Sequence, residues 1–315
     1  MKIPFTKMHG IGNDYVYIDT FGDASELHQL SEAELATLVR QMSDRRFGIG
    51  GDGVILIHPP TAGVDHAPAV ARMQMFNADG SQGEMCGNGL RCVAKYVGDR
   101  GLGDVGDADR FAIETAAGTL AIDVARDADG AIESASVDMG PAILDAGKVP
   151  TTVPGDADGR VVDREVTFDG RSVRITCVSM GNPHCVIFVD DHIDSQTYDD
   201  WVLNVGPKIE TDPRFPNRTN IEFVQVMSPT EVRQRTWERG SGETWACGTG
   251  ASAVCVAGFL VGRTERRITN HLRGGDLELN YRPDGHVVMT GGATEVFRGV
   301  IDTDDFREPI ARSAV

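Results

Sequence analysis

The chain has 315 residues, and this length, with 41% hydrophobic residues, predicts about two domains with ordinary hydrophobic cores. Its 47 acidic residues outnumber its 30 Lys and Arg, and the net charge of −17 argues against nucleic acid or an anionic membrane as a partner. The N-terminus lacks the apolar core of a signal peptide, and no stretch has the roughly 20 apolar residues of a membrane span, so we expect a cytoplasmic protein.

Residues 1–139 are expected to form the first half of the fold. Apolar and alternating patterns predict strands at residues 2–5, 15–18, 54–57, 72–76, 111–114, 119–124 and 135–138. Ser31 and Glu34 form a capping-box pattern, which predicts an amphipathic helix over 32–45. Gly, Pro, Asn and Asp predict turns or loops at 8–14, 47–53 and 58–70.

Residues 140–295 are expected to form a second half that repeats this theme. Its strands are predicted at residues 173–178, 185–189, 221–226, 276–281 and 286–290. Residues 139–141 are interpreted as the joint, and 145–160 as a polar insertion; no role is assigned to 145–160 or 58–70. A strand near 295–301 is expected to return to the first sheet, so residues 296–315 are assigned to the first half.

Cys86 lies at the end of a glycine-rich turn, directly before a helical pattern. Apolar residues recur with helical spacing at Leu90, Val93, Ala94 and Val97, which predicts a helix that begins near Gly87 or Asn88. The unpaired N–H groups and the positive dipole end of a helix N-terminus favour a thiolate over a thiol and also bind carboxylates. We therefore expect a reactive thiol at Cys86.

A second copy of this arrangement occurs at residues 240–262. Cys247 again follows a glycine turn, and Gly248, Thr249 and Gly250 correspond to Gly87, Asn88 and Gly89. A single buried cysteine at a helix start is an ordinary structural residue, but two copies in matching glycine frames argue for a functional pair. Two like half-sites predict a duplicated fold that faces itself.

Two facing thiols suit a redox pair, a metal site, a nucleophile with a helper, or an acid and a base on opposite faces of one carbon. A metal site favours closely spaced Cys and His, and a nucleophilic thiol needs a histidine base, for which only His184 is a candidate. The acid–base interpretation uses more of the features, because removal of an amino-acid α-hydrogen needs an aimed base and fixed dipoles. One thiolate then takes a proton while the opposite thiol donates one, and the carbon inverts.

Four further residues are candidates whose structural alternatives remain open. Asn13 is either a ligand donor or the side chain of an Asx-turn. His184 either modulates a thiol or is only hydrogen-bonded within its turn. The pair Glu238 and Arg239 is either solvated or, because it ends on a glycine loop, placed to bind a zwitterion.

Together these motifs resemble those of the diaminopimelate epimerase family. The matching motifs are Met8-His9-Gly10-Ile11-Gly12-Asn13-Asp14, Phe76-Asn77-Ala78-Asp79-Gly80-Ser81, Met85-Cys86-Gly87-Asn88-Gly89, Met180-Gly181-Asn182-Pro183-His184, Asn220, and Glu238-Arg239-Gly240 through Cys247-Gly248-Thr249-Gly250. They cover nearly the whole chain in family order, and the paired cysteine motifs are highly specific.

The resemblance implies an α/β (mixed α+β) fold of two pseudo-symmetric domains, each a largely antiparallel mixed sheet wrapped around a central helix. It implies an enzyme without cofactor or metal that interconverts LL- and meso-2,6-diaminopimelate, in lysine and peptidoglycan precursor synthesis. It also implies a homodimer.

The same resemblance implies roles for individual residues. Cys86 and Cys247 are the acid–base pair, and His184 and Glu238 tune the thiols. The expected substrate contacts are Asn13, Asn77, Asn182, Asn220, Glu238 and Arg239, with the backbone N–H groups at Gly87, Asn88, Gly248 and Thr249 for the reacting carboxylate. In one departure, some members carry Gln where this chain has Gly53, so that contact is absent or comes from the backbone.

Two rival functions remain at this point. A proline or hydroxyproline racemase resembles the chain in its two cysteines, but Asn88 and the Glu238–Arg239 pair favour a dicarboxylate substrate. A redox sensor that forms a Cys86–Cys247 disulfide is the rival from another class, since thiols that flank one carbon can also oxidise.

Overall fold

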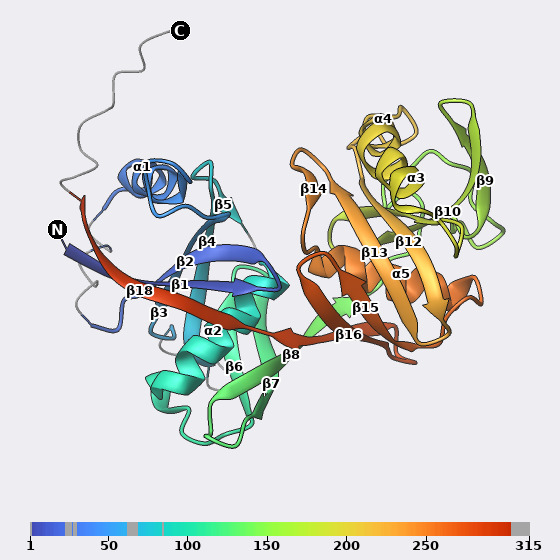
Figure 1. Ribbon diagram of the computed structural model, residues 1–315. Coiled ribbons are helices and arrows are strands. Elements are labelled where there is room, and N and C mark those ends of the chain that lie inside the picture. The colour runs from blue at the N-terminus through green and yellow to red at the C-terminus, as the bar shows by residue number, and fades with distance from the viewer. Residues whose placement is uncertain (1, 23–26, 28–29, 62–68, 84, 304–315) are drawn as a thin grey trace, which may run out of the picture. The chain divides into compact units, whose positions relative to one another are not determined.

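The computed structural model describes residues 2–22, 27, 30–61, 69–83 and 85–303 of a mixed α/β protein dominated by strands (Figure 1). The chain separates into two compact units, Met1–Ala135 with Gly292–Val315, and Ser136–Gly291. The limits drawn from the sequence lie a few residues further along, inside β8 (Ile132–Pro141) and β18 (Thr294–Asp302). None of the helices in the described part is long and apolar enough to cross a membrane.

The first unit is one mixed ladder of strands. Its order is β18, β1 (Lys2–Gly10), β2 (Asn13–Asp19), β3 (Gly53–His58), β4 (Ala69–Asn77), β6 (Arg110–Thr115) and β7 (Gly118–Arg126), with β5 (Gln82–Gly83) beside β4. The β2–β3 and β4–β6 pairs are parallel and the others antiparallel. Because β18 pairs with β1, the predicted return of the chain to the first sheet is confirmed.

The second unit repeats this ladder strand for strand. Its order is β9 (Arg164–Phe168), β10 (Arg171–Ser179), β11 (Pro183–Phe188), β12 (Asn220–Ser228), β13 (Glu231–Glu238), β15 (Arg267–Leu272) and β16 (Gly275–Tyr281), with β14 (Gly242–Thr244) beside β13. The parallel pairs, β11–β12 and β13–β15, fall at the same places as in the first unit. The ladder continues through β17 (His286–Gly292) to β8.

One buried helix lies against the strands of each unit. In the first unit, α2 (Gly87–Arg100) follows β5 and contacts β1, β2 and β4, and its predicted stripe, which includes Leu90 and Val93, is fully buried. In the second unit, α5 (Gly248–Leu260) follows β14 and contacts β10, β11, β12, β15 and β16. The predicted duplication, with a central helix in each half, is confirmed.

Several local predictions differ from the structure. The predicted turn at 8–14 is only the two residues Ile11 and Gly12, both with positive φ, because β1 and β2 pair as far as Gly10 and Asn13. Residues 139–141 are not a connecting joint but belong to strand β8.

The insertion at 145–160 is also more than a polar surface segment. Val149 and Val153 are buried in the core of the second unit, and Asp145 and Arg160 form a β-bridge. Of the predicted loop at 58–70, residues 62–68 lie outside the described residues, and Ala69 already belongs to β4.

Besides β13 and β14, five elements of the second unit were not predicted from sequence patterns. These are β9, β15, α3 (Ser195–Asp200), a π-helical turn (Trp201–Val205) and α4 (Gly206–Glu210). Polar residues and Pro207 hide the helical pattern, whereas Tyr198, Val202 and Ile209 anchor these turns in the core.

The capping box of α1 (Glu32–Ser43) yields a stability prediction. The Ser31 side chain accepts from the Glu34 N–H, and the Glu34 carboxylate accepts from the Ser31 N–H. We expect Ser31→Ala to lower the free energy of unfolding by about 1 kcal/mol in urea denaturation, because the exposed helix end loses its cap. Ser31→Thr, which keeps the hydroxyl, is the control and should lose less; equal losses would contradict the capping role.

Candidate functional site

Each predicted cysteine is the N-cap residue of the buried helix of its unit. Cys86 has φ −134° and ψ 115°, and its Sγ accepts from the Gly89 N–H at 3.4 Å. Cys247 has φ −124° and ψ 103°, and its Sγ accepts from the Gly250 N–H at 3.3 Å. We call the surroundings of Cys86 the first half-site and those of Cys247 the second half-site.

The strand registers identify equivalent positions in the two half-sites. The β2–β3 ladder opens with the pair Tyr15–Gly53, and the β11–β12 ladder opens with His184–Asn220. The equivalent positions are therefore Asn13 and Asn182, Tyr15 and His184, Gly53 and Asn220, Asn77 and Glu238, and Cys86 and Cys247. Most of the predicted side chains thus come from matching strand ends and helix starts of the duplicated fold.

In the first half-site, Asn13 contacts the thiol directly. The Cys86 Sγ donates to the Asn13 Oδ1 at 3.3 Å, and the Asn13 Nδ2 donates to the Asp52 Oδ2 at 2.7 Å. The Asn13 side chain therefore does more than satisfy an Asx-turn. It hydrogen-bonds both the Cys86 thiol and the Asp52 carboxylate.

The other asparagines of the first half-site have protein partners in the ligand-free structure. The Asn77 Nδ2 donates to the Ser81 Oγ at 3.0 Å, within the turn that follows β4. Asn88 is buried, and its Oδ1 accepts from the Arg91 Nη2 at 2.9 Å. Gly87 and Asn88 occupy the first two positions of α2, whose backbone N–H groups precede the first intrahelical bonds.

Gly53 lies where the backbone leaves no space for a side chain. A Cβ at this position would lie 1.9 Å from the Phe76 carbonyl oxygen and 2.9 Å from the Tyr15 ring. Gly53 therefore offers no side chain to the first half-site, whereas the equivalent position in the second unit carries Asn220.

The second half-site contains a buried histidine–carboxylate pair. The His184 Nδ1 lies 2.8 Å from the Glu222 Oε1, and both side chains are fully buried. The His184 Nε2 lies 3.0 Å from the Asn182 Oδ1. His184 therefore contacts a predicted substrate-binding residue.

The glycine after each Cys-Gly-x motif shows where the two half-sites differ. A Cβ on Gly250 would lie 2.6 Å from the Glu222 Oε1 and 3.2 Å from the Cys247 Sγ. A Cβ on Gly89 would instead lie 2.7 Å from the Ile55 side chain. The start of α5 in the second unit therefore lies over the Glu222 carboxylate, whereas the start of α2 in the first unit lies over the Ile55 alkyl side chain.

The electrostatics of Cys247 depend on more than its position at a helix N-terminus. Burial, followed by the charges of Glu238 and Glu222, raises the pKa of the Cys247 thiol well above its ordinary value. In the ligand-free protein, burial and these two carboxylates therefore oppose the thiolate that a helix N-terminus alone would favour at Cys247. Cys92 and Cys255, inside the helices, are buried thiols whose burial raises their pKa to about 11 and about 12.

The remaining predicted residues lie at the end of β13 and the start of β12. The Asn220 Nδ2 donates to the Pro183 carbonyl and its Oδ1 accepts from the Arg239 N–H, both at 2.9 Å. Glu238 accepts from the Thr244 hydroxyl, and Arg239 is exposed with its Nη1 3.0 Å from the Asn217 carbonyl. Asn220 therefore ties β11 to the loop that carries Arg239.

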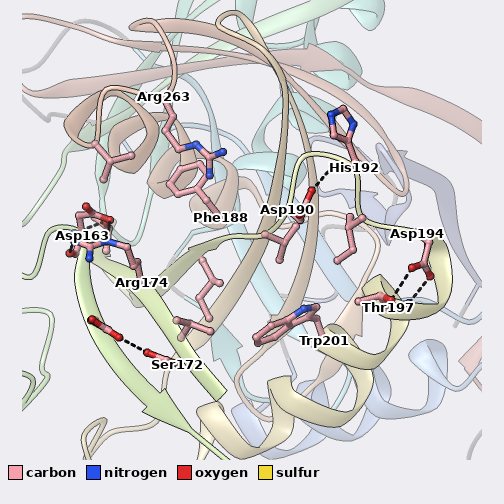
Figure 2. A pocket seen from close by; sticks show the side chains of 17 residues that line it. Asp163, Ser172, Arg174, Phe188, Asp190, His192, Asp194, Thr197, Trp201 and Arg263 are labelled. Carbon is pink, nitrogen blue, oxygen red and sulfur yellow. Dashed lines mark hydrogen bonds and ion pairs between the residues drawn. The ribbon is translucent and has the colours of Figure 1, made fainter. Parts of the chain in front are cut away.

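A hollow of about 900 Å³ in the second unit is separate from all these residues (Figure 2). Figure 2 shows Arg174, Phe188, Trp201 and Arg263 around it, and none of the predicted site residues lines it. Arg174 is paired with Asp163, and Arg263 with Asp191. The hollow is therefore not part of the candidate site at the cysteines, and its two arginines are already paired with carboxylates.

Comparison with known proteins identifies the family. The family profile described as Diaminopimelate epimerase matches residues 5–144 and 176–296. The chain is 47% identical over 303 residues to the diaminopimelate epimerase of Leptospira biflexa serovar Patoc, covering 96% of this chain and 100% of that one. The chain belongs to the diaminopimelate epimerase family. It is also 45% identical over 296 residues to the diaminopimelate epimerase of Pelotomaculum thermopropionicum, covering 94% of this chain and 97% of that one.

A solved structure supports the fold. The hydroxyproline epimerase of Agrobacterium vitis, with bound trans-4-hydroxy-L-proline, superposes with a TM-score of 0.64 at 14% identity, covering 95% of this chain and 91% of that one. At this identity the likeness shows the fold alone, which this member of the diaminopimelate epimerase family shares.

In this diaminopimelate epimerase family member, sequence patterns did not indicate one residue in each half-site, Asp52 in the first and Glu222 in the second. Asp52 lies within the glycine loop at 47–53, and nothing in that pattern indicates its bond to Asn13. Glu222 had a usable signal, because a charged residue within an otherwise apolar, buried strand needs a partner.

The charges around Cys247 predict a change in its reactivity. Since Glu238 raises the pKa of Cys247, we expect Glu238→Gln to lower that pKa and to speed alkylation of Cys247 by iodoacetamide severalfold at mildly alkaline pH. Peptide mapping by mass spectrometry measures the rate at each cysteine. Glu231→Gln, at the exposed other end of β13, is the control and should leave the rate unchanged; an equal rate in Glu238→Gln would contradict this electrostatic assignment.

Proposed function

We propose that this chain is a cytoplasmic diaminopimelate epimerase that interconverts LL- and meso-2,6-diaminopimelate without a cofactor, in lysine and peptidoglycan precursor synthesis. The observation that carries the proposal is the pair of equivalent helix starts, each with a cysteine as its N-cap residue. The family membership and the identities of 45 to 47% to relatives of that name support the substrate.

In the proposed reaction, Cys86 and Cys247 act on opposite faces of the α-carbon. One thiolate takes the α-proton, and the other thiol donates its proton to the opposite face of the resulting carbanion. The atoms balance, because one S–H bond forms as the C–H bond breaks and another S–H bond breaks as the new C–H bond forms. Swapping the two roles gives the reverse reaction.

The negative charge of the carbanion spreads into the α-carboxylate, which needs fixed donors. We assign this task to the backbone N–H groups at Gly87 and Asn88 and at Gly248 and Thr249, the first residues of α2 and α5. A helix start presents such donors together with the positive end of its dipole. No metal or other cation is required for this assignment.

The remaining substrate contacts are assigned to polar side chains at strand ends. These are Asn13, Asn77, Asn182, Asn220, Glu238 and Arg239. The exposed guanidinium of Arg239 suits the distal carboxylate as a two-pronged donor, and Glu238 suits an ammonium group. Through its charge, Glu238 also tunes Cys247, and His184 acts through its contact with Asn182.

An experiment in deuterated water tests this function. Reduced, metal-free protein with LL-diaminopimelate should form meso product with deuterium at the inverted α-carbon, followed by NMR and chiral chromatography. We expect Cys86→Ala and Cys247→Ala each to lose at least about a hundredfold in epimerisation, because each removes one acid–base group. Cys92→Ala and Cys255→Ala, which remove thiols inside the same helices, are the controls.

Two outcomes would contradict the proposal. Absence of turnover by folded, fully reduced protein would reject this substrate and direct the search to proline and related amino acids. Full activity in either active-site cysteine variant would reject two-base catalysis and leave the redox interpretation of the thiols.

We also propose a homodimer that uses β18. This strand carries three exposed apolar side chains, Val296, Phe297 and Val300, which are 53, 46 and 63% exposed. Apolar side chains gathered on one strand favour burial against a partner, and a second copy of the chain supplies the commonest one.

The dimer proposal predicts the effect of a charge on β18. We expect Val300→Asp to shift the mass in solution, measured by light scattering after size exclusion, from two chains to one, because a buried charge opposes association. Met227→Asp, which changes an exposed apolar residue of the second unit, should leave the mass at two chains. A single-chain mass for the unaltered protein at micromolar concentration would contradict the dimer.

A further inference from the structure

Asp52 lies in the loop before β3, and its backbone is fixed from two sides. Its N–H donates to the Asp14 carbonyl at 2.7 Å, and its carbonyl accepts from the Ala78 N–H at 3.0 Å. The side chain therefore starts from a defined place between the β1–β2 hairpin and the turn after β4.

Both carboxylate oxygens of Asp52 accept hydrogen bonds. The Oδ2 accepts from the Asn13 Nδ2 at 2.7 Å and from the Asp14 N–H at 3.0 Å. The Oδ1 accepts from the Arg45 Nη2 at 2.8 Å, and Arg45 also holds Asp14 through both its terminal nitrogens. This arrangement fixes the direction in which Asp52 faces Asn13.

An ionised carboxylate only accepts hydrogen bonds, so the Asn13 amide must turn its NH₂ group toward Asp52. The Asn13 carbonyl oxygen then faces the Cys86 Sγ at 3.3 Å, where it accepts from the thiol. A hydrogen bond made by the neutral form of a group favours that form over the charged one. The orientation of one amide thus favours a thiol at Cys86.

The second half-site shows that the fold does not require this arrangement. The position equivalent to Asp52 is Thr219, whose hydroxyl donates to the Asn220 carbonyl. The Oδ1 of Asn182, the equivalent of Asn13, faces His184 instead of the cysteine. Both units therefore have the asparagine, but Asp52 orients Asn13 in the first unit, whereas His184 contacts Asn182 in the second.

We propose that Asp52 is a positioning residue of the first half-site, which acts through Asn13 to hold Cys86 as a thiol in the ligand-free enzyme. Without the acceptor at Asp52, the Asn13 amide is free to turn its NH₂ group to the sulfur, where it favours the thiolate. The catalytic consequence of this orientation, though not the orientation itself, rests on the proposed function.

Two variants of Asp52 separate orientation from charge. Asp52→Asn removes the charge but keeps an oxygen that accepts from Asn13, whereas Asp52→Leu removes both. We expect the pH of half-maximal alkylation of Cys86 by iodoacetamide to be lower in Asp52→Leu than in Asp52→Asn by roughly half a unit or more, the size of one net hydrogen bond. Cys247, mapped in the same samples, should show no difference between the two variants.

Equal alkylation profiles of Cys86 in the two variants would overturn the proposal, since charge alone would then act. A circular dichroism melt checks that each variant is folded, and Asp52→Ala, which removes the same acceptor with a smaller side chain, replaces the leucine variant if that one unfolds. Alkylation needs no substrate, so its outcome is independent of whether the protein epimerises diaminopimelate.

Epimerase assays then give the catalytic consequence. We expect kcat to fall at least tenfold in Asp52→Leu and to be largely retained in Asp52→Asn, because only the leucine variant releases the Asn13 amide. If kcat falls equally in both variants, Asp52 does not act through its hydrogen bond to Asn13.

Discussion

The site depends on one local constraint, which is that a cysteine must end a strand–turn segment and begin a buried helix. In this position the sulfur meets the N–H of the third helical residue, and the first two N–H groups of the helix point away from the helix body. The ladder then brings Asn13 to the start of one strand and Asn182 directly before its equivalent, and it brings Asn77 or Glu238 to the end of another strand. The same strand order in both units therefore produces the same set of positions twice.

The two copies of this geometry differ in a few side chains that the fold leaves open. Ile55 lies under the start of α2, and Glu222 lies under the start of α5. On the neighbouring strands β2 and β11, the equivalent positions carry Tyr15 and His184. These substitutions give the two thiols different surroundings, with carboxylates near Cys247 and an amide carbonyl on Cys86. In the proposed reaction, LL- and meso-2,6-diaminopimelate differ only at the reacting α-carbon, so each presents its α-hydrogen to a different cysteine, and the two bases need not meet identical environments.

Much of the fold was accessible from the sequence because the signals were local. The capping box at Ser31, the apolar stripe after Cys86 and the repeated Cys-Gly-x-Gly motif each specify their own structure over a few residues. The duplication of the ladder and the return of β18 followed from the repeat and from a late apolar segment. The turns of α3 and α4 were missed because their burial, through Tyr198 and Ile209, is decided by contacts with strands distant in sequence.

The same distinction holds for the site. Cys86, Cys247 and the glycines around them are recognisable because the residues of each motif are adjacent in the sequence. The bond from Asp52 to Asn13 joins residues 39 positions apart, and the pair of His184 and Glu222 joins residues 38 positions apart, so only the paired strands bring them together. The raised pKa of Cys247 could not be read from neighbouring residues either, because a helix N-terminus is a local feature, whereas burial and the charge of Glu222 depend on contacts distant in sequence.

The choice of N-cap residues shows where this chain gives up local stability. The exposed helix α1 begins with Ser31 in a full capping box, and α3 begins with Asp194, which accepts from the Thr197 N–H at 2.9 Å. Cysteine is not among the favoured caps, and its sulfur accepts at 3.3 to 3.4 Å in α2 and α5. These two helices tolerate weak caps because nearly all their side chains are buried, so packing rather than capping holds them. A thiol can therefore occupy the helix start, where its chemistry is useful, only because the sheet of each unit already encloses the helix.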